Sequence, residues 1–267
     1  MAHKSGLLWQ LRFDQGHVSY LLGTIHLQSS VLTGNQDLIG SLLDSCSHFA
    51  AEVDLDRIHD LDNVRFFKLD PGQTWLSLLS PAQCKRMSRF CTERFALDIN
   101  DFASLYPMML IHEISLRLVE HKSALSMDQQ LWELARSKGM ETRGLEDFET
   151  HFNIIRQIDL ADQLSMLKAL MRNMDRSNRM YRKLLQAYEC EDLRTIYQAS
   201  RKMLGKYRRL MLFERNAVMA RSMIEWGSRE PGFFTCGAGH LYGQEGVLRL
   251  LKKQLVRLKH VSLATVS

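Results

Sequence analysis

The sequence predicts an α/β protein in which a mixed central sheet is surrounded by helices and carries a helical insertion. Short β-type runs of apolar residues lie toward both ends of the chain, whereas the middle carries leucine, methionine, arginine and lysine at helical spacing. No internal repeat or low-complexity linker interrupts the sequence. We therefore predict a single domain over residues 1–267, with helical segments at 72–125 and 155–228 flanking the sheet core.

The strands are predicted from apolar runs that end at glycine or at acidic residues. Residues 7–13 and 17–24 are separated by Asp14-Gln15-Gly16, which is typical of an antiparallel hairpin with a glycine in its turn. A third run has carboxylates at its end, beginning with Glu52. The predicted sheet is built from residues 7–24, 48–53, 140–145 and 232–237.

Helices are predicted between these strands. The first is expected near residues 35–46. Pro81 suits the first turn of another helix, because proline lacks the N–H that this turn does not use. Asp101 is expected to cap a helix that runs toward Val119 and is kinked or offset at Pro107.

The second half of the helical region has clearer boundaries. Ser126 is expected to be the N-cap of a helix that Gly139 ends. Residues 159–228 contain no proline and only the glycines Gly205 and Gly227. We predict two or three long helices there, with a break near Gly205.

Composition narrows the class of protein. Hydrophobic residues make up 45% of the chain, which is ordinary for a globular protein. No apolar run approaches the ~20 residues of a membrane-spanning helix. Five cysteines without CxxC spacing indicate neither a disulfide framework nor a cysteine zinc cluster. Since no export signal is visible, we expect reduced cysteines and a cytoplasmic protein.

The net charge of +5 is concentrated in a basic stripe between residues 168 and 221. We favour a solvated helical face as its interpretation, and contact with phosphates is the alternative. No nucleic-acid partner is expected. The stripe consists of Lys168, Arg172, Arg176, Arg179, Arg182, Lys183, Arg201, Lys202, Lys206, Arg208 and Arg209.

Two Gly-x-x-His tetrapeptides follow predicted strands about two hundred residues apart. One ends at His26 and the other at His240. In open α/β sheets ligands gather beyond the carboxyl ends of the strands, where Glu52 is also expected. Two imidazoles and a carboxylate are a common ligand set for a catalytic divalent ion. From the residues alone, a shared metal or acid/base site and hydrogen-bonded structural histidines both remain open.

Several other enzyme classes lack their sequence motifs here. The chain has no G-x-S-x-G, no GxxxxGK[ST] and no HExxH. Gly237-x-Gly239 begins like a dinucleotide-binding loop, but the third glycine is Gly243, one position late. A nicotinamide enzyme is therefore not expected.

Sequence blocks along the whole chain carry a family resemblance. The blocks are Leu8-Trp9, LLGTIH at 21–26, AEVD at 51–54, MDQQL at 127–131, RGLED at 143–147, ERNAVMA at 214–220 and GAGHLYGQEGVLRLL at 237–251. In the order and spacing of these blocks the chain is similar to the TraB/GumN family, which in turn resembles the Tiki proteases and, more distantly, the ChaN and erythromycin-esterase group.

The resemblance implies a mixed-sheet α/β core and a set of site residues. His26 and His240 match the two GxxH histidines and Glu52 matches the family glutamate, so all three are candidate catalytic residues and metal ligands. Arg215, with Asn216, matches a polar pair before the final strand and is a further catalytic candidate. Candidates for lining the site are Asp54, Asp128, Glu146 and Asn216. An acid is favoured in the first turn of a helix in any case, which is a structural alternative for Asp128 and Glu146.

The function implied is that of a metal-dependent hydrolase, a metalloprotease-like peptidase acting on a peptide or protein substrate with Mn²⁺, Co²⁺ or Zn²⁺. Glu52 is either a ligand or the general base, and Arg215 binds a substrate carboxylate or stabilises an oxyanion. The alternative is a non-catalytic protein that binds or sequesters peptides, of the pheromone-shutdown type. Haem binding, by analogy with ChaN, needs an axial ligand that we do not identify.

Overall fold

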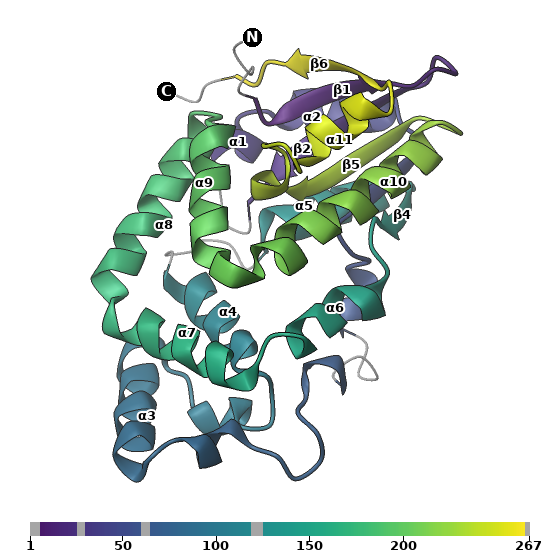
Figure 1. Cartoon of the computed structure of the whole chain (residues 1–267). Coiled ribbons are helices and arrows are strands. Elements are labelled where there is room, and N and C mark those ends of the chain that lie inside the picture. The colour runs from purple at the N-terminus through teal and green to yellow at the C-terminus, as the bar shows by residue number, and fades with distance from the viewer. Residues whose placement is uncertain (1–5, 26–29, 60–64, 119–124, 265–267) are drawn as a thin grey trace. The chain divides into compact units, whose positions relative to one another are not determined.

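The structure is a computed structural model of the whole chain and describes residues 6–25, 30–59, 65–118 and 125–264 (Figure 1). Its helices and strands follow one another in this order: β1 (Leu8–Arg12), β2 (Val18–Thr24), α1 (Ser30–Thr33), α2 (Gln36–Asp44), β3 (His48–Ala51), η1 (Asp56–His59), η3 (Trp75–Leu78), α3 (Pro81–Phe95), η4 (Ile99–Phe102), α4 (Pro107–Leu118), α5 (Met127–Ser137), β4 (Glu141–Gly144), α6 (Phe148–Arg156), α7 (Leu160–Arg172), α8 (Met174–Glu189), α9 (Leu193–Leu204), η5 (Gly205–Tyr207), the π-helical η6 (Arg209–Glu214), α10 (Arg215–Gly227), β5 (Gly232–Gly237), η7 (Ala238–His240), α11 (Val247–Lys253) and β6 (Arg257–Val261).

Within the described residues, six strands form one mixed sheet in the order β4-β3-β5-β2-β1-β6. The four strands β4, β3, β5 and β2 are parallel, and β1 is antiparallel to both β2 and β6. Figure 1 shows β1 and β6 together at one edge of this sheet. The α/β prediction with a mixed central sheet is confirmed, and every predicted strand is present.

β6 is the strand that the sequence did not predict. It pairs with β1 along its whole length, from Arg257 opposite Arg12 to Val261 opposite Leu8. None of its residues is fully buried. A charged edge strand has little apolar alternation to reveal it, and charges on an edge also discourage pairing with another chain.

Local sequence signals explain several helix boundaries. The hydroxyl of Ser126 accepts a hydrogen bond from the backbone of Gln129, whose side chain returns one to the backbone of Ser126, and α5 begins there. Gly139 has a φ of +73° just after α5, and the N–H of Met140 reaches back to the carbonyl of Ala135. This is the turn that favours glycine after a helix. Both predicted boundaries are confirmed.

The helix predicted from Asp101 through Pro107 is wrong. Asp101 lies inside the short η4, whose N-cap is Asp98. α4 begins at Pro107 instead of being kinked there. Proline fits that position because the first turn of a helix leaves its N–H groups without intrahelical acceptors. The predicted end at Val119 lies outside the described residues.

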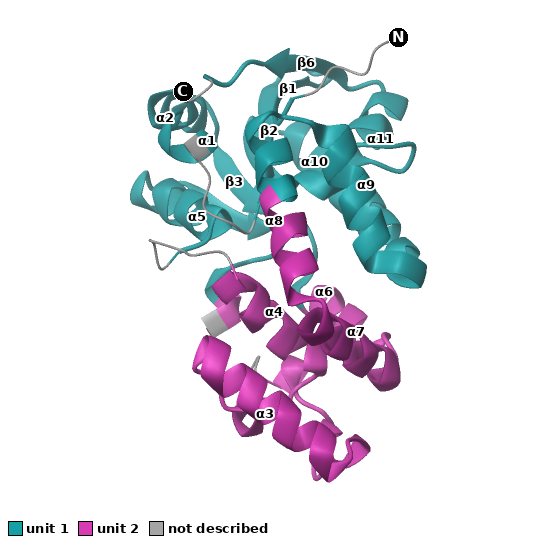
Figure 2. Cartoon of the chain, turned by 90° about the vertical axis from the view of Figure 1, so that its left-hand side faces the viewer, with its two compact units in different colours: residues 1–56, 123–148, 183–267 teal, residues 57–122, 149–182 magenta. Residues whose placement is uncertain are grey.

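The chain divides into two compact units (Figure 2). The first contains residues 1–56, 123–148 and 183–267, and the second contains 57–122 and 149–182. All regular structure in 155–228 is helical, but residues 183–228 belong to the first unit. The organisation of residues 1–267 as a single domain stays a prediction.

Each unit has apolar packing of its own. In the first, the fully buried Phe49 of β3 stacks on Phe233 of β5 at 6.1 Å and meets Trp132 of α5 edge-on at 5.9 Å. Burying one such ring contributes roughly 1.5–3 kcal/mol. In the second, α3, α4 and α7 share a core centred on buried residues that include Trp75 and Cys91. None of the described helices combines the length and apolar composition that crossing a lipid bilayer requires.

Candidate functional site

Polar residues follow the parallel strands of the first unit where those strands end. Glu52 comes directly after Ala51, the last residue of β3, and Glu146 comes two positions after Gly144, the last residue of β4. β5, which pairs with β3 on the side away from β4, ends at Gly237. Because the carboxyl ends of parallel strands meet at one edge of a sheet, residues distant in the sequence are brought together there.

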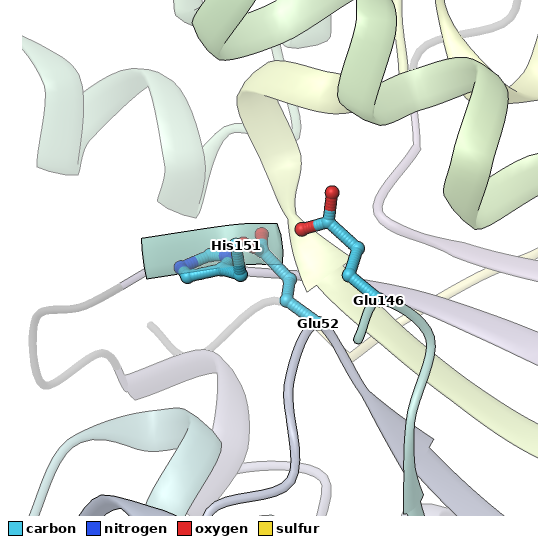
Figure 3. A group of neighbouring side chains, drawn as sticks. All are labelled: Glu52, Glu146 and His151. Carbon is cyan, nitrogen blue, oxygen red and sulfur yellow. The ribbon is translucent and has the colours of Figure 1, made fainter. Parts of the chain in front are cut away.

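The two glutamates are held side by side by backbone pairing that continues beyond β3 and β4. The N–H of Leu145 donates to the carbonyl of Ala51 at 2.7 Å, and the N–H of Glu146 donates to the carbonyl of Glu52 at 2.9 Å. Figure 3 shows both side chains leaving this paired backbone, and one carboxyl oxygen of each lies within 4.8 Å of the other. His151, also labelled in Figure 3, belongs to α6 of the second unit and is not counted among the site residues.

Both carboxyl oxygens of Glu52 accept hydrogen bonds, as an ionised carboxylate does. The backbone N–H of Gly237 donates to Oε1 at 2.6 Å, and Nη2 of Arg215 donates to Oε2 at 2.5 Å. A Cβ at Gly237 would lie 3.2 Å from Oε1, so the glycine allows this close approach. The Glu52 side chain is only 14% exposed. The end of β3 is thereby tied to the end of β5.

Arg215 is a buried cation between two carboxylates. It is the first residue of α10, and its Nε and Nη2 donate to Oε2 of Glu146 at 2.9 and 2.6 Å. Burial by itself would lower the pKa of the guanidinium, but the charges and hydrogen bonds of Glu52 and Glu146 outweigh it and raise that pKa above its ordinary value. Arg215 is therefore charged at any physiological pH. Two carboxylates against one guanidinium leave the group with an excess negative charge.

His240 is positioned by Asn216, the residue after Arg215. Nδ1 of the imidazole lies 2.6 Å from Oδ1 of Asn216, and Nδ2 of that amide donates to the carbonyl of Glu245 at 2.6 Å. A carbonyl oxygen only accepts, so the nitrogen of the amide must face Glu245 and its oxygen must face His240. Neutral His240 therefore carries its proton on Nδ1.

The other imidazole nitrogen faces the carboxylates. Nε2 of His240 lies 3.8 Å from Oε1 of Glu52. This separation is too long for a hydrogen bond between them. Two ligand atoms that each lie about 2.1 Å from one ion are at most about 4.2 Å apart, so an ion bound by both atoms fits this distance. We call Glu52, Glu146, Arg215, Asn216 and His240 the strand-end site.

The electrostatics at Cys236 place Asp128 in the same surroundings. Burial raises the pKa of the Cys236 thiol well above its ordinary value, and the negative charges of Glu52 and Asp128 raise it further; Arg215 lowers it by less than either, and Glu146 adds a smaller increase. Asp128 is 8% exposed and lies in the first turn of α5. The end of β5 is therefore a region of net negative potential, which favours a bound cation.

Asp54 has a local role next to this site. Its Oδ1 accepts a hydrogen bond from the backbone N–H of Asp56 at 3.0 Å, where η1 begins. Side chains of this kind commonly cap turns and short helices. Among the described residues no hydrogen bond or ion pair joins the Asp54 side chain to the strand-end site, and its expected place in the lining stays a prediction.

His26 lies outside the described residues, and its approach to His240 stays a prediction. The residues before it are described. A Cβ at Gly23 would lie 2.6 Å from the side chain of Leu241 and 3.2 Å from Cα of Ala238. The glycine that opens the first GxxH motif therefore packs directly against the turn of the second. Thr24, paired with Gly237, has a buried hydroxyl with no hydrogen-bond partner in the described parts of the chain.

Tyr188 is a residue at this edge that the sequence did not reveal. Its fully buried hydroxyl donates to the carbonyl of Gly23 at 2.7 Å and lies 3.2 Å from the sulfur of Met127. Tyr188 is near the end of α8, 165 residues from Gly23. It lies in a helix of mixed polar and apolar residues, so a helical pattern alone does not single it out.

Comparison with known proteins agrees with this architecture. The model of the TraB/PrgY/gumN family matches residues 7–259. The chain belongs to the TraB/PrgY/gumN family. It is also similar to a protein of Treponema pallidum (strain Nichols), described as an uncharacterized protein, with 24% identity over 181 residues. That match covers 64% of this chain and 52% of the relative, so the chain spans about half the length of the curated relative it matches. No solved structure matches.

The family match extends over all the quoted sequence blocks, from Leu8 to Leu251. It includes every candidate site residue, from His26 to His240. The match itself assigns no reaction to these residues. Their chemistry has to be argued from the strand-end site.

Proposed function

We propose that this TraB/PrgY/gumN-family chain is a metal-dependent hydrolase acting on peptide bonds. The observation that carries the proposal is the pairing of Nε2 of His240 with Oε1 of Glu52, 3.8 Å apart. Because Asn216 accepts a hydrogen bond from Nδ1, the Nε2 atom of neutral His240 carries the lone pair that a metal ligand needs. A second carboxylate, Glu146, and the negative potential at the end of β5 add to the attraction for a divalent ion.

Glu52 and His240 would hold the ion, with His26 as the third ligand on the strength of the family resemblance. Mn²⁺, Co²⁺ and Zn²⁺ all accept imidazole and carboxylate ligands. Such an ion supplies an acidified water molecule as the nucleophile and polarises the carbonyl that it attacks. We favour Glu52 as a ligand over Glu52 as the general base, because each of its oxygens already accepts a strong hydrogen bond.

Arg215 is proposed to be a positioning residue. From the sequence, two roles were expected for Arg215: binding a substrate carboxylate or stabilising an oxyanion. Its Nε and Nη2, however, are committed to Glu146 and Glu52 at 2.5–2.9 Å. A guanidinium held by two carboxylates orients them and compensates part of their charge.

The experiment is metal analysis of the full chain together with hydrolysis of a peptide library, with chelator or with added Mn²⁺. We expect stoichiometric metal and cleavage that the chelator abolishes. Glu52→Gln, which keeps the shape of the side chain and removes its charge, should abolish cleavage. The matched control is Glu133→Gln, at an exposed position of α5. Full turnover by Glu52→Gln with metal present would contradict the assignment.

A peptide-binding function without catalysis is the alternative outcome of the same experiment. Peptides that bind the wild-type chain but are never cleaved, whatever metal is added, would replace the hydrolase by a sequestering protein. His26→Ala and His240→Ala sharpen the distinction, because loss of a ligand removes turnover while leaving a peptide-binding surface in place. Their stability should be compared in chelator, since a bound ion stabilises the folded wild type by mass action.

A further inference from the structure

A second candidate site lies in the second unit, independent of the proposed hydrolase. It is an open cavity of about 450 Å³ formed by the end of α3, the end of α7 and the beginning of α8. Cavities that bind small molecules typically measure about 300–1,000 Å³. None of its lining residues belongs to the strand-end site.

The cavity has an apolar part and a charged part. Phe90, Met171 and Met174 line it and also pack on the core of the second unit, which fixes the walls. Four arginines and Asn173 also line it, and the one carboxylate among the lining residues is that of Asp175. The arginines are Arg94, Arg172, Arg176 and Arg179.

These four arginines differ from four other arginines of the same unit. Arg65, Arg89, Arg117 and Arg156 each form an ion pair with a glutamate or an aspartate. None of the four cavity arginines forms an ion pair anywhere in residues 6–25, 30–59, 65–118 or 125–264, and Arg94 instead lies 5.8 Å over the ring of Phe90. Four like charges around one small cavity repel one another, and a bound anion relieves that repulsion.

The sequence did not single out this group. Arg172, Arg176 and Arg179 were part of the basic stripe, for which a solvated helical face was the favoured interpretation. Arg94 stands nearly eighty residues earlier and outside that stripe. The fold brings Arg94 to the other three arginines around the apolar part of the cavity. A uniformly solvated helical face has no such apolar part.

We propose that this cavity binds a small phosphorylated molecule. Guanidinium groups offer paired N–H donors that match phosphate oxygens, and arginine is the preferred residue for such contacts. The apolar part of the cavity accommodates the carbon skeleton of the ligand next to its phosphate. A free phosphorylated metabolite and a phospholipid headgroup present the same chemistry to the arginines.

The test begins with calorimetric titration of the full chain with pyrophosphate at low salt. We expect one binding site, with affinity that falls as salt is added. Arg94→Gln/Arg176→Gln should weaken binding by at least about tenfold, because the variant loses charge-assisted hydrogen bonds to the phosphate. The control, Arg86→Gln/Lys202→Gln, also removes two exposed positive charges, one of them from α3, but neither residue lines the cavity. It should bind like wild type.

A second variant and a second probe complete the experiment. Arg94→Lys/Arg176→Lys keeps the charge but loses the paired donors, and should bind more weakly than wild type. Sedimentation with phosphatidic acid vesicles, with and without pyrophosphate as competitor, separates the two sources of phosphate. Vesicle binding that pyrophosphate abolishes identifies a headgroup, and pyrophosphate binding without vesicle binding identifies a free metabolite.

Three results would overturn the proposal. They are the absence of binding to either probe, unchanged pyrophosphate binding by Arg94→Gln/Arg176→Gln, and an equal loss in the control variant. The last result would mean that overall charge, not the cavity, attracts the anion. Because all four substituted arginines and lysines are exposed, thermal unfolding of each variant should match wild type and exclude a folding defect.

Discussion

One nitrogen of Arg215 serves both glutamates of the strand-end site: Nη2 lies 2.5 Å from Oε2 of Glu52 and 2.6 Å from Oε2 of Glu146. Arg215→Met keeps much of the side-chain volume but leaves both carboxylates with no cation. Removing one partner of a buried ion pair typically costs about 3–5 kcal/mol. We expect the free energy of unfolding, measured with urea, to fall by about that amount.

A double variant separates charge from packing in this prediction. Arg215→Met/Glu146→Gln removes one of the stranded charges and should recover part of the lost stability. The control Arg249→Met replaces an exposed arginine of α11, and surface substitutions of this kind stay within about 0.5 kcal/mol. If Arg215→Met were as stable as this control, the network would not stabilise the fold.

The ring nitrogen of His240 that carries the proton is a second testable feature of the structure. Asn216 accepts from Nδ1, so nitrogen NMR of the wild type should show neutral His240 protonated at Nδ1. Asn216→Ala removes the acceptor and should give a mixture of tautomers. Loss of a hydrogen-bonding partner of a metal ligand typically weakens metal affinity about 10–100-fold. A wild-type His240 protonated at Nε2 would contradict this reading of the site.

The sequence revealed the strands and the strand-end residues because both leave local signals. β3 is a short apolar run with Glu52 at its end, and β5 is another with a GxxH turn after it. β6 left no such signal, because its residues are partly or fully exposed and carry charges. The prediction for Pro107 is wrong for a different reason: a proline can begin a helix or kink one, and tertiary contacts decide between these outcomes.

The partners of the site residues were beyond the sequence. No local feature of the sequence shows that Arg215 contacts Glu52 and Glu146, which lie 163 and 69 residues away. The same holds for the hydroxyl of Tyr188 at the carbonyl of Gly23. Such pairings depend on how the helices pack on the sheet. They change the expected role of Arg215 from contacting substrate to positioning the carboxylates.

Tyr188 predicts how stability depends on alkaline pH. Burial, followed by the charges of Asp128 and Glu191, raises the pKa of this phenol well above 10.0 in the folded chain. The unfolded chain ionises its tyrosines near pH 10, so there the folded state binds more protons and stability falls as pH rises. The stability due to the raised pKa is fully present below about pH 10 and is lost as the pH rises toward the pKa of Tyr188 in the folded chain.

Tyr188→Phe tests this effect by urea unfolding across pH. At pH 8 the variant should be less stable by about 0.5–1.5 kcal/mol, because the carbonyl of Gly23 loses its donor. Above pH 10 the difference should narrow, since phenylalanine cannot ionise. Burial also raises the pKa of Cys91, to about 11, but that contribution is common to both proteins. Parallel stability curves from pH 8 to 11 would contradict the prediction.

Two glycines of the first unit should respond in opposite ways to the same substitution. A Cβ at Gly144 would lie 2.5 Å from the backbone nitrogen of Asp54 and 2.9 Å from the carbonyl oxygen of Glu146. These backbone atoms cannot retreat without opening the pairing that sets Glu146 beside Glu52. Gly144→Ala should therefore cost about 1–3 kcal/mol, as overpacking typically does, and should also weaken metal binding at the strand-end site.

Gly40→Ala is the matched change. Gly40 lies within α2, and a Cβ there meets no atom within 4 Å. Alanine loses less conformational freedom than glycine when a helix forms, so this variant should be more stable than wild type by about 0.5–1 kcal/mol. Urea unfolding of the two variants beside wild type measures both signs. If Gly144→Ala were also neutral or stabilising, the close approach of the chain after β4 would not constrain the site, and Glu146 would owe its position to Arg215 alone.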